Sequence, residues 1–205
     1  MTKLSIVLIY LIINLTGNAQ FTVNYNSVLS KDDFKYLAKG DSIFHSTEDE
    51  IIFLMNFARW NGAFYFDNVI VPYLNSRKTK SNSYIRSLKS QLYKTSALPL
   101  LFENNSLHQI AKQYAIQGGN KGVVGHSDFE KRYTNSLSLF TSVGENISYG
   151  YINPIEIVNE LLIDHGIANL GHRKNILNEK FNSIGVYIAP HKKYKTHCVI
   201  SFGAR

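Results

Sequence analysis

The sequence predicts an α+β fold, because helical patterns fill its first two thirds and strand patterns fill its end. The clearest helical pattern lies at 105–119, where Leu107, Ile110, Ala111, Tyr114 and Ala115 recur at the spacing of one helix face. Two β-like runs, 184–189 and 198–202, are joined by the basic loop 191–196. The 205 residues are 44% apolar, which excludes a disordered chain, and a single Cys excludes a small disulfide-stapled protein.

The helices before residue 105 follow from short local signals. A capping box at Thr47-Glu48-Asp49-Glu50 predicts the start of a helix over 51–60, which is apolar nearly all round and is therefore expected to be buried. Gly62 is expected to end it. A short helix over 65–74 should be distorted at Pro72. A further amphipathic helix is marked by Tyr84, Leu88 and Leu92.

After residue 105 the pattern alternates between helices and irregular segments. Gly118-Gly119 is expected to end the helix that begins at Asn105, and 120–142 is predicted to be irregular. Asn153 followed by Pro154 predicts an N-cap and a helix that runs to about His165 and ends at Gly166.

The N-terminus has the pattern of a secretory signal peptide. A lysine at position 3 precedes the 12-residue apolar run Leu4–Leu15, and Gly17-Asn18-Ala19 supplies small residues for cleavage after Ala19. The prediction is a signal peptide over 1–19, an N-terminal extension over 20–46 and one domain over 47–205. An uncleaved anchor helix is the alternative. The expected location is secreted or periplasmic, with no stable membrane span after cleavage, because no further run of about 18 apolar residues occurs.

The formal charge of +7 favours acidic partners such as anionic lipid, acidic glycans or nucleic acid. Export would remove the protein from cytoplasmic nucleic acid, so no specific nucleic-acid partner is expected. An unknown small ligand, a lipid or a component of the cell envelope or the extracellular medium remains as the partner. The lone Cys198 lies among apolar neighbours in the last β-like run, and we expect it to be buried.

Three short polar motifs, which we call words, stand out: Gly125-His126-Ser127, Gly144-Glu145-Asn146 and Gly171-His172-Arg173. Each places an ionisable side chain beside a glycine, where the backbone can turn tightly. Two imidazoles and a carboxylate that converge from separate loops would suffice for a divalent metal, zinc foremost, with a position left for water. The alternative for each word is a structural histidine or acid that is satisfied by hydrogen bonds.

A second acid for such a site would come from the helix that begins at Pro154. Glu156 and Glu160 fall opposite its apolar stripe, where they are expected to be solvated. Asp164 falls at the border of the stripe, in the last turn, where the helix dipole disfavours a negative charge. His165 projects toward the stripe and is a rival ligand or a core histidine.

In this order, the words resemble the CAP domain family of cysteine-rich secretory proteins, antigen 5 and pathogenesis-related proteins, which has many secreted bacterial members. The resemblance runs from about Glu48 to Gly203 and rests on Gly125-His126-Ser127, Gly144-Glu145-Asn146-Ile147, Gly171-His172-Arg173-Lys174-Asn175-Ile176-Leu177, Phe181, Ile184-Gly185-Val186 and Val199-Ile200-Ser201-Phe202-Gly203. It implies a three-layer α-β-α sandwich with a central antiparallel sheet. The disulfides of the animal and plant relatives are absent here.

The resemblance also implies a central cleft with two His and two acids. His126, Glu145 and His172 match three of these positions. Asp164 stands where animal and plant relatives have a Glu, and Leu161 stands where they have a Trp.

Three functions are compatible with this cleft. The first is an exported binding module that holds a divalent cation, zinc foremost, through His126, His172, Glu145 and Asp164. The second is a metal-dependent hydrolase or peptidase, with Glu145 as general base and Ser127 as a hydrogen-bond donor to an oxyanion. The third is lipid or sterol binding in an apolar groove between helices.

Overall fold

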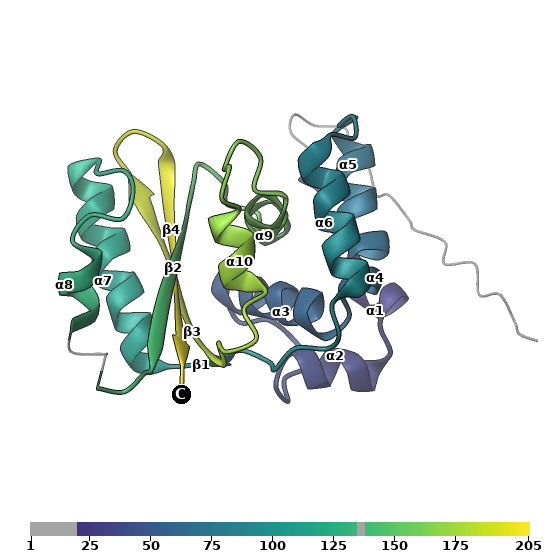
Figure 1. Ribbon diagram of the computed structural model, residues 1–205, viewed down its shortest axis with the longest axis horizontal. Coiled ribbons are helices and arrows are strands. Elements are labelled where there is room, and N and C mark those ends of the chain that lie inside the picture. Colours follow the sequence, from purple (N-terminus) through teal and green to yellow (C-terminus); the bar gives the residue numbers. More distant parts are fainter. Residues whose placement is uncertain (1–19, 135–137) are drawn as a thin grey trace, which may run out of the picture.

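The computed structural model describes residues 20–134 and 138–205. A four-stranded sheet in the order β1-β3-β4-β2 lies between helical layers (Figure 1); its strands are β1 Phe102–Glu103, β2 Ser142–Tyr149, β3 Ser183–His191 and β4 Lys195–Ala204. One face carries α7 Asn105–Lys121 and α8 Phe129–Tyr133, and the other carries α3 Thr47–Trp60, α9 Pro154–Ile163 and α10 Gly171–Ile176. This confirms the predicted α-β-α sandwich.

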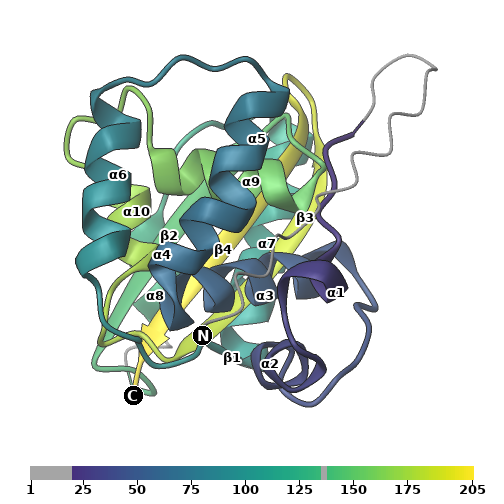
Figure 2. The same cartoon turned by 90° about the vertical axis from the view of Figure 1, so that its right-hand side faces the viewer.

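Further helices lie outside α3 and α9, so one side of the molecule is two helices deep (Figures 1 and 2). They are α4 Gly62–Tyr65, the π-helix η1 Phe66–Ile70, α5 Val71–Ser76 and α6 Ser83–Lys94. The main apolar core lies between these helices, α3, α9 and the sheet. Four apolar or amphipathic helices expected from the sequence are all present close to their predicted bounds. They are α3, α6, α7 and α9.

The sheet is antiparallel except for its shortest strand. β3 and β2 both pair with β4 in antiparallel register, whereas β1 pairs in parallel with β3. The prediction of an irregular 120–142 was wrong in part, because α8 begins at Phe129. The word Gly144-Glu145-Asn146 lies on the edge strand β2 rather than on a loop, with Glu145 opposite Ser201. Gly, Glu and Asn are poor strand formers, so this strand depends on its pairing with β4.

Helix α3 begins at Thr47, before the predicted 51–60, and its N-cap lies one residue earlier than the sequence indicated. Its capping box is Ser46 with Asp49, in place of Thr47 with Glu50: the Ser46 hydroxyl accepts from the Asp49 amide at 3.1 Å, and the Asp49 carboxylate accepts from the Ser46 amide at 3.0 Å. Residues 51–59 are all buried, as the apolar pattern predicted.

The predictions that Gly62 and Gly118-Gly119 end helices need correction, because these glycines allow close packing instead. Gly62 begins α4 instead of merely ending α3, and a Cβ there would lie 2.8 Å from the Leu92 carbonyl oxygen. Helix α7 continues through Gly119, where a Cβ would lie 2.1 Å from the Pro190 oxygen, and it ends at Lys121, with Gly122 as its C-cap at φ +68. Gly119 therefore lets α7 lie directly on β3, and Gly118 lets it lie close to His197 of β4.

The expected distortion at Pro72 lies one turn earlier, in η1, and Pro72 itself occupies the first turn of α5. Proline has no N–H to donate back along the helix, so the turn before it is free to widen.

The segment 20–46 forms α1 Tyr25–Val28 and α2 Lys31–Leu37 and packs into the main core. The Tyr25 hydroxyl donates to Glu50 at 2.6 Å, and burial is the main cause that raises the pKa of both groups. The Asn153 amide donates to the Phe21 carbonyl at 2.7 Å. The predicted signal peptide lies outside the described residues. Within residues 20–134 and 138–205, no helix is long and apolar enough to cross a membrane.

Candidate functional site

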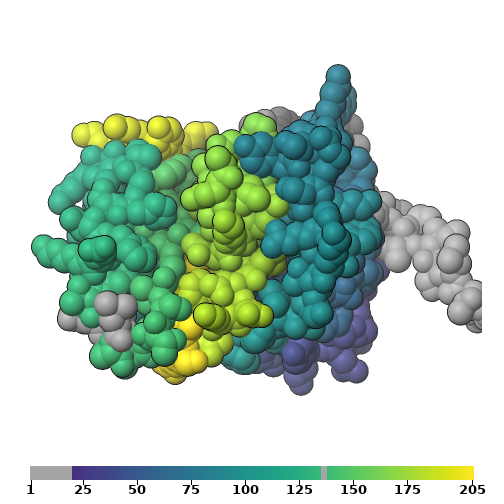
Figure 3. Space-filling view, in the orientation of Figure 1, coloured from purple at the N-terminus to yellow at the C-terminus, as the bar shows by residue number. Residues whose placement is uncertain are grey.

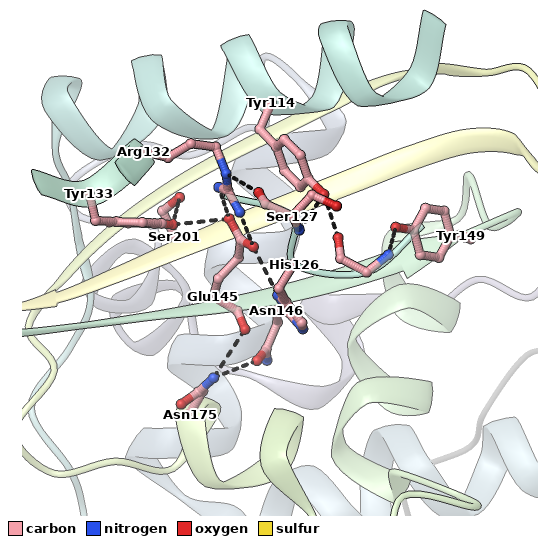
Figure 4. A network of polar contacts seen from close by, with 11 residues as sticks. Tyr114, His126, Ser127, Arg132, Tyr133, Glu145, Asn146, Tyr149, Asn175 and Ser201 are labelled. Carbon is pink, nitrogen blue, oxygen red and sulfur yellow. Dashed lines mark hydrogen bonds and ion pairs between the residues drawn. The ribbon is translucent and has the colours of Figure 1, made fainter. Parts of the chain in front are cut away.

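The first half of the site is a histidine–carboxylate pair between His126, in the loop before α8, and Glu145 on β2. His126 Nδ1 lies 2.9 Å from Glu145 Oε1, and the Glu145 side chain is fully buried (Figure 4). A carboxylate only accepts, so Nδ1 carries the hydrogen, and Nε2 of the neutral ring keeps its lone pair. The ring is about half exposed. The pair therefore leaves Nε2 without a hydrogen-bond partner among the described residues, on a ring that is partly open to solvent.

Arg132, on α8, is the partner that sequence reasoning missed. Its guanidinium contacts both Glu145 oxygens, with Nη2 2.9 Å from Oε1 and Nη1 against Oε2, and its carbon lies 3.7 Å from the centre of the Tyr114 ring. The Tyr133 hydroxyl adds a contact to Oε2 at 3.3 Å. Burial raises the pKa of Glu145, but the hydrogen bonds and charges of Arg132 and His126 outweigh it and lower that pKa overall.

Two tyrosine hydroxyls hold the loop that carries His126. The Tyr114 hydroxyl donates to the Gly125 carbonyl and accepts from the Ser127 amide at 3.1 Å. The Tyr149 hydroxyl accepts from the Gly125 amide at 3.0 Å. Gly125 has φ +87, a conformation that favours glycine. The loop position is thus fixed by side chains from α7 and β2, which lie on either side of it (Figure 4).

The second half of the site pairs Asp164 with His172. Asp164 Oδ1 lies 2.7 Å from His172 Nδ1, while Oδ2 accepts from the amides of His172 at 3.0 Å and Arg173 at 3.2 Å. The sequence placed Asp164 in the last turn of α9, but in the structure it follows the helix as a left-handed C-cap with φ 57. Its carboxylate therefore lies over the first turn of α10, where amide donors favour a negative charge.

Arg173 joins α10 to its neighbours. Its buried guanidinium donates to the carbonyls of Leu162 at 2.6 Å and Ile163 at 2.9 Å at the end of α9, and to Tyr84 and Ser87 of α6 at 3.0 Å each. Burial lowers its pKa. These bonds hold α10, and with it His172, against the end of α9.

Asparagine side chains connect the two halves. Asn146 donates to the His172 carbonyl at 2.9 Å, and Asn175 donates to Asn146 Oδ1 at 2.9 Å and to the Glu145 carbonyl at 3.2 Å. Because Glu145 and Asn146 are successive residues of β2, their side chains leave opposite faces of the edge strand. One histidine thus comes from the α8 side and the other from the α10 side.

The remaining candidates belong to neither histidine–carboxylate pair. Ser127 is exposed beside His126, and its amide is used by Tyr114. His165 is exposed, with its ring 5.1 Å from that of Tyr84, so the expectation that it projects into the core was wrong. Glu156 and Glu160 are not simply solvated: Arg77 contacts Glu156 at 2.5 Å, and the Tyr73 hydroxyl donates to Glu160 at 2.7 Å. Cys198 is fully buried, as predicted.

The four acid and histidine side chains form two separate pairs. Across residues 20–134 and 138–205, no group of three or more His, Cys, Asp and Glu side chains is arranged to hold a metal ion. Each carboxylate is occupied by its histidine and by further donors: Arg132 and Tyr133 for Glu145, backbone amides for Asp164. The groups left for a ligand are the two Nε2 atoms.

Comparisons with known proteins give one sequence family and several solved structures that are similar to this chain. The sequence model of the CAP, or cysteine-rich secretory protein, family matches residues 58–202. An outer surface protein from Borrelia burgdorferi is 24% identical over 60% of this chain and 89% of its own, with a TM-score of 0.45. An extracellular protein with an SCP domain from Bacillus anthracis is 19% identical over 86% of this chain and 44% of its own, with a TM-score of 0.49.

The chain belongs to the CAP family, since the family model covers more than half of its length. The comparison with curated proteins gives no match.

Proposed function

We propose that this protein is an exported binding module whose cleft holds a divalent cation, zinc foremost, through Nε2 of His126 and of His172. The observation that carries the proposal is that each Nδ1 faces a carboxylate, at 2.9 Å from Glu145 and 2.7 Å from Asp164. Histidines that bind metals are commonly oriented by a carboxylate in this way. The donor set fits zinc, which accepts imidazole nitrogen and fills open positions with water.

Glu145 and Asp164 orient the rings in this proposal, in place of the direct ligation that the sequence left open. The protein supplies two ligands, so water or a polar group of a bound molecule completes the coordination shell. A cation held in this way would act as a Lewis acid toward such a group.

Zinc titration calorimetry tests the proposal. His126→Ala and His172→Ala should each lose most of the affinity, because a site with two protein ligands cannot spare one. His45→Ala, at an exposed histidine of the N-terminal segment, is the matched control, and His165→Ala tests the rival ligand. Affinity should fall in acid, because the binding nitrogen must be unprotonated. Equal zinc affinity in the two cleft variants and in His45→Ala would refute the shared cation.

A hydrolase in the same cleft is less well supported. A general base works best with a pKa near the working pH, and the pKa of Glu145 is instead lowered by Arg132 and His126. An orienting role for Glu145 predicts that Glu145→Gln weakens zinc binding by about 10–100-fold without abolishing it.

Lipid binding between helices has one observation in its favour. A groove of about 260 Å³ between α5 and α6 is lined by Phe66, Leu74 and Ile85, with Arg86 and Lys89 at its rim. Titration with a fatty acid checks this alternative: Ile85→Glu should abolish binding if the groove is the site, and unchanged binding would exclude it.

Export itself is proposed from the apolar N-terminus. Sequencing the N-terminus of the exported protein should give Gln20 as its first residue. A protein that still begins at Met1 in the membrane fraction would overturn the proposal.

A further inference from the structure

One end of the molecule is built from three turns that are connected to one another. They are the end of α7 with the loop that follows it (119–125), the turn after β2 (149–152) and the β3–β4 hairpin (191–196). The hairpin lies along the upper left edge of Figure 3, in yellow. We call this end the lysine tip.

The three turns form one platform. The Lys192 amide donates to the Gly119 carbonyl at 3.0 Å, and the Gly150 amide donates to the Thr196 carbonyl at 3.2 Å. His191, buried between the turns, donates from Nε2 to the Val123 carbonyl at 2.9 Å. The side chains on this platform are therefore held in a defined arrangement.

The charge of the lysine tip has one sign. Lys121, Lys192, Lys193 and Lys195 are all exposed, and the three turns contain no Asp or Glu. By contrast, the exposed Lys31, Lys35 and Lys39 around α2, at the opposite end in Figure 1, are interspersed with Asp32, Asp33 and Asp41. The positive charge is thus uncompensated within the tip.

Apolar side chains project among these lysines. Val124 is 49% exposed, Tyr194 47% and Ile152 60%. Lys195, the first residue of β4 after the three-residue hairpin loop 192–194, has φ +65, a conformation that favours glycine. Lys195 thus occupies a left-handed backbone conformation that is sterically unfavourable for a residue with a side chain.

We propose that the lysine tip docks on an anionic lipid bilayer. Lysines are attracted to anionic headgroups, tyrosine favours the headgroup level, and aliphatic side chains gain by entering the hydrocarbon boundary. An acidic glycan would use the lysines but would gain nothing from Val124 and Ile152. Docking places the bilayer beside the His126 loop, because Val124 and His126 flank Gly125. The proposal does not depend on metal binding in the cleft.

Vesicle co-sedimentation of the purified exported protein tests the charge. The probes are vesicles of phosphatidylglycerol mixed with phosphatidylcholine, and of phosphatidylcholine alone. The variant Lys192→Gln/Lys193→Gln/Lys195→Gly removes three charges and gives the hairpin its favoured glycine. It should bind the anionic vesicles about 100-fold more weakly at low salt, since each lysine contributes about five-fold.

A control variant matches this one in charge and in backbone. Lys31→Gln/Lys35→Gln/Lys39→Gly also removes three exposed lysines and also places a glycine at a left-handed residue, since Lys39 has φ 56. It should keep nearly all binding to the anionic vesicles. Equal weakening of the two variants would show that only net charge matters and would overturn the docking surface.

Tryptophan substitutions test insertion. Tyr194→Trp should shift its fluorescence to the blue on anionic vesicles, whereas Tyr36→Trp on α2, where the tyrosine is 56% exposed, should not. No shift, or the same shift at both ends, would overturn the proposal. It would also be overturned if the lysine-tip variant lost binding to an acidic polysaccharide or to single-stranded DNA but bound the anionic vesicles as tightly as the unmodified protein.

Discussion

Glu145 and Asp164 each orient a histidine, but different kinds of donor balance their charges. Glu145 lies on an edge strand, fully buried, and faces the guanidinium of Arg132. Asp164 lies in a left-handed turn and accepts two backbone amides of α10. The first half therefore depends on one side chain from a distant element, and the second depends on the local path of the backbone.

This difference predicts how each half fails. A buried charge that loses its only cationic partner pays the full cost of desolvation, whereas amide donors remain when a capping side chain is changed. The first half should thus be sensitive to a single substitution outside the motif, and the second to the backbone conformation at one position.

The largest effect is expected from Arg132→Ala. It leaves the buried Glu145 carboxylate without its cation and should lower the free energy of unfolding by about 3–5 kcal/mol. Arg77→Ala is the matched control, because that arginine also pairs with a glutamate but is 43% exposed; its loss should stay below about 1 kcal/mol. Urea unfolding measures both. Similar losses would show that the Glu145 pair is not an effectively buried one.

Asp164→Ala should have the next largest effect and should lower the free energy of unfolding by about 2–3 kcal/mol. It loses the cap of α10 and places alanine at φ 57, which costs about 1–2 kcal/mol by itself. Asp164→Asn keeps an acceptor oxygen and tolerates the left-handed turn, so it should cost about 1 kcal/mol or less. If both variants lose the same stability, charge decides the second half, and the backbone argument is wrong.

A smaller effect separates the halves by pH. His197 is buried against His191 and against Tyr114 and Tyr149, the two tyrosines that hold the His126 loop. Its Nδ1 donates to the Ala115 carbonyl, and its Nε2 has no hydrogen-bond partner among the described residues. Burial is the main cause that lowers the pKa of His197. The unfolded chain thus binds this proton first, so stability is complete above about pH 6.5 and falls as the pH drops below it.

Amide hydrogen exchange, corrected for intrinsic rates, locates this effect. On acidification the Ser127 amide should lose protection before the amides of His172 and Arg173 do. His197→Gln removes the titrating group and should remove the difference. Equal loss of protection in both halves would argue against a link between His197 and the His126 loop.

The smallest effect is expected at Cys198, which lies between Ser148 of β2 and Ile188 of β3. Burial raises the pKa of its thiol, so the native thiolate is scarce and shielded. Thiol reagents should label it only after unfolding, and Cys198→Ala should change zinc affinity by less than about two-fold if both halves keep their geometry. Rapid labelling of the native protein would contradict this burial.

Several elements were predictable because their signals are local. Residues 51–59 of the predicted apolar helix are buried in α3, and Asn153 caps α9 through its side chain, as the sequence indicated. His126, Glu145, Asp164 and His172 were all named from short words and from the family resemblance, and the structure brings them into two connected pairs.

Other parts depend on contacts between distant residues. Arg132 could not be foreseen, because α8 has only five residues and shows no useful periodicity, and its partner Glu145 lies on another element. Strand β2 contains poor strand formers and exists through its pairing with β4. The left-handed turn at Asp164 is held by the amides of α10, which come later in the chain.

By itself, the sequence determined the helices with strong apolar periodicity and the burial of Cys198. These depend on spacing and residue type, which act over a few positions. The tertiary structure alone decided which carboxylate faces which histidine, how each charge is balanced and that the lysines of three turns gather at one end. Such features arise when segments far apart in the chain pack together, and no local pattern records that packing.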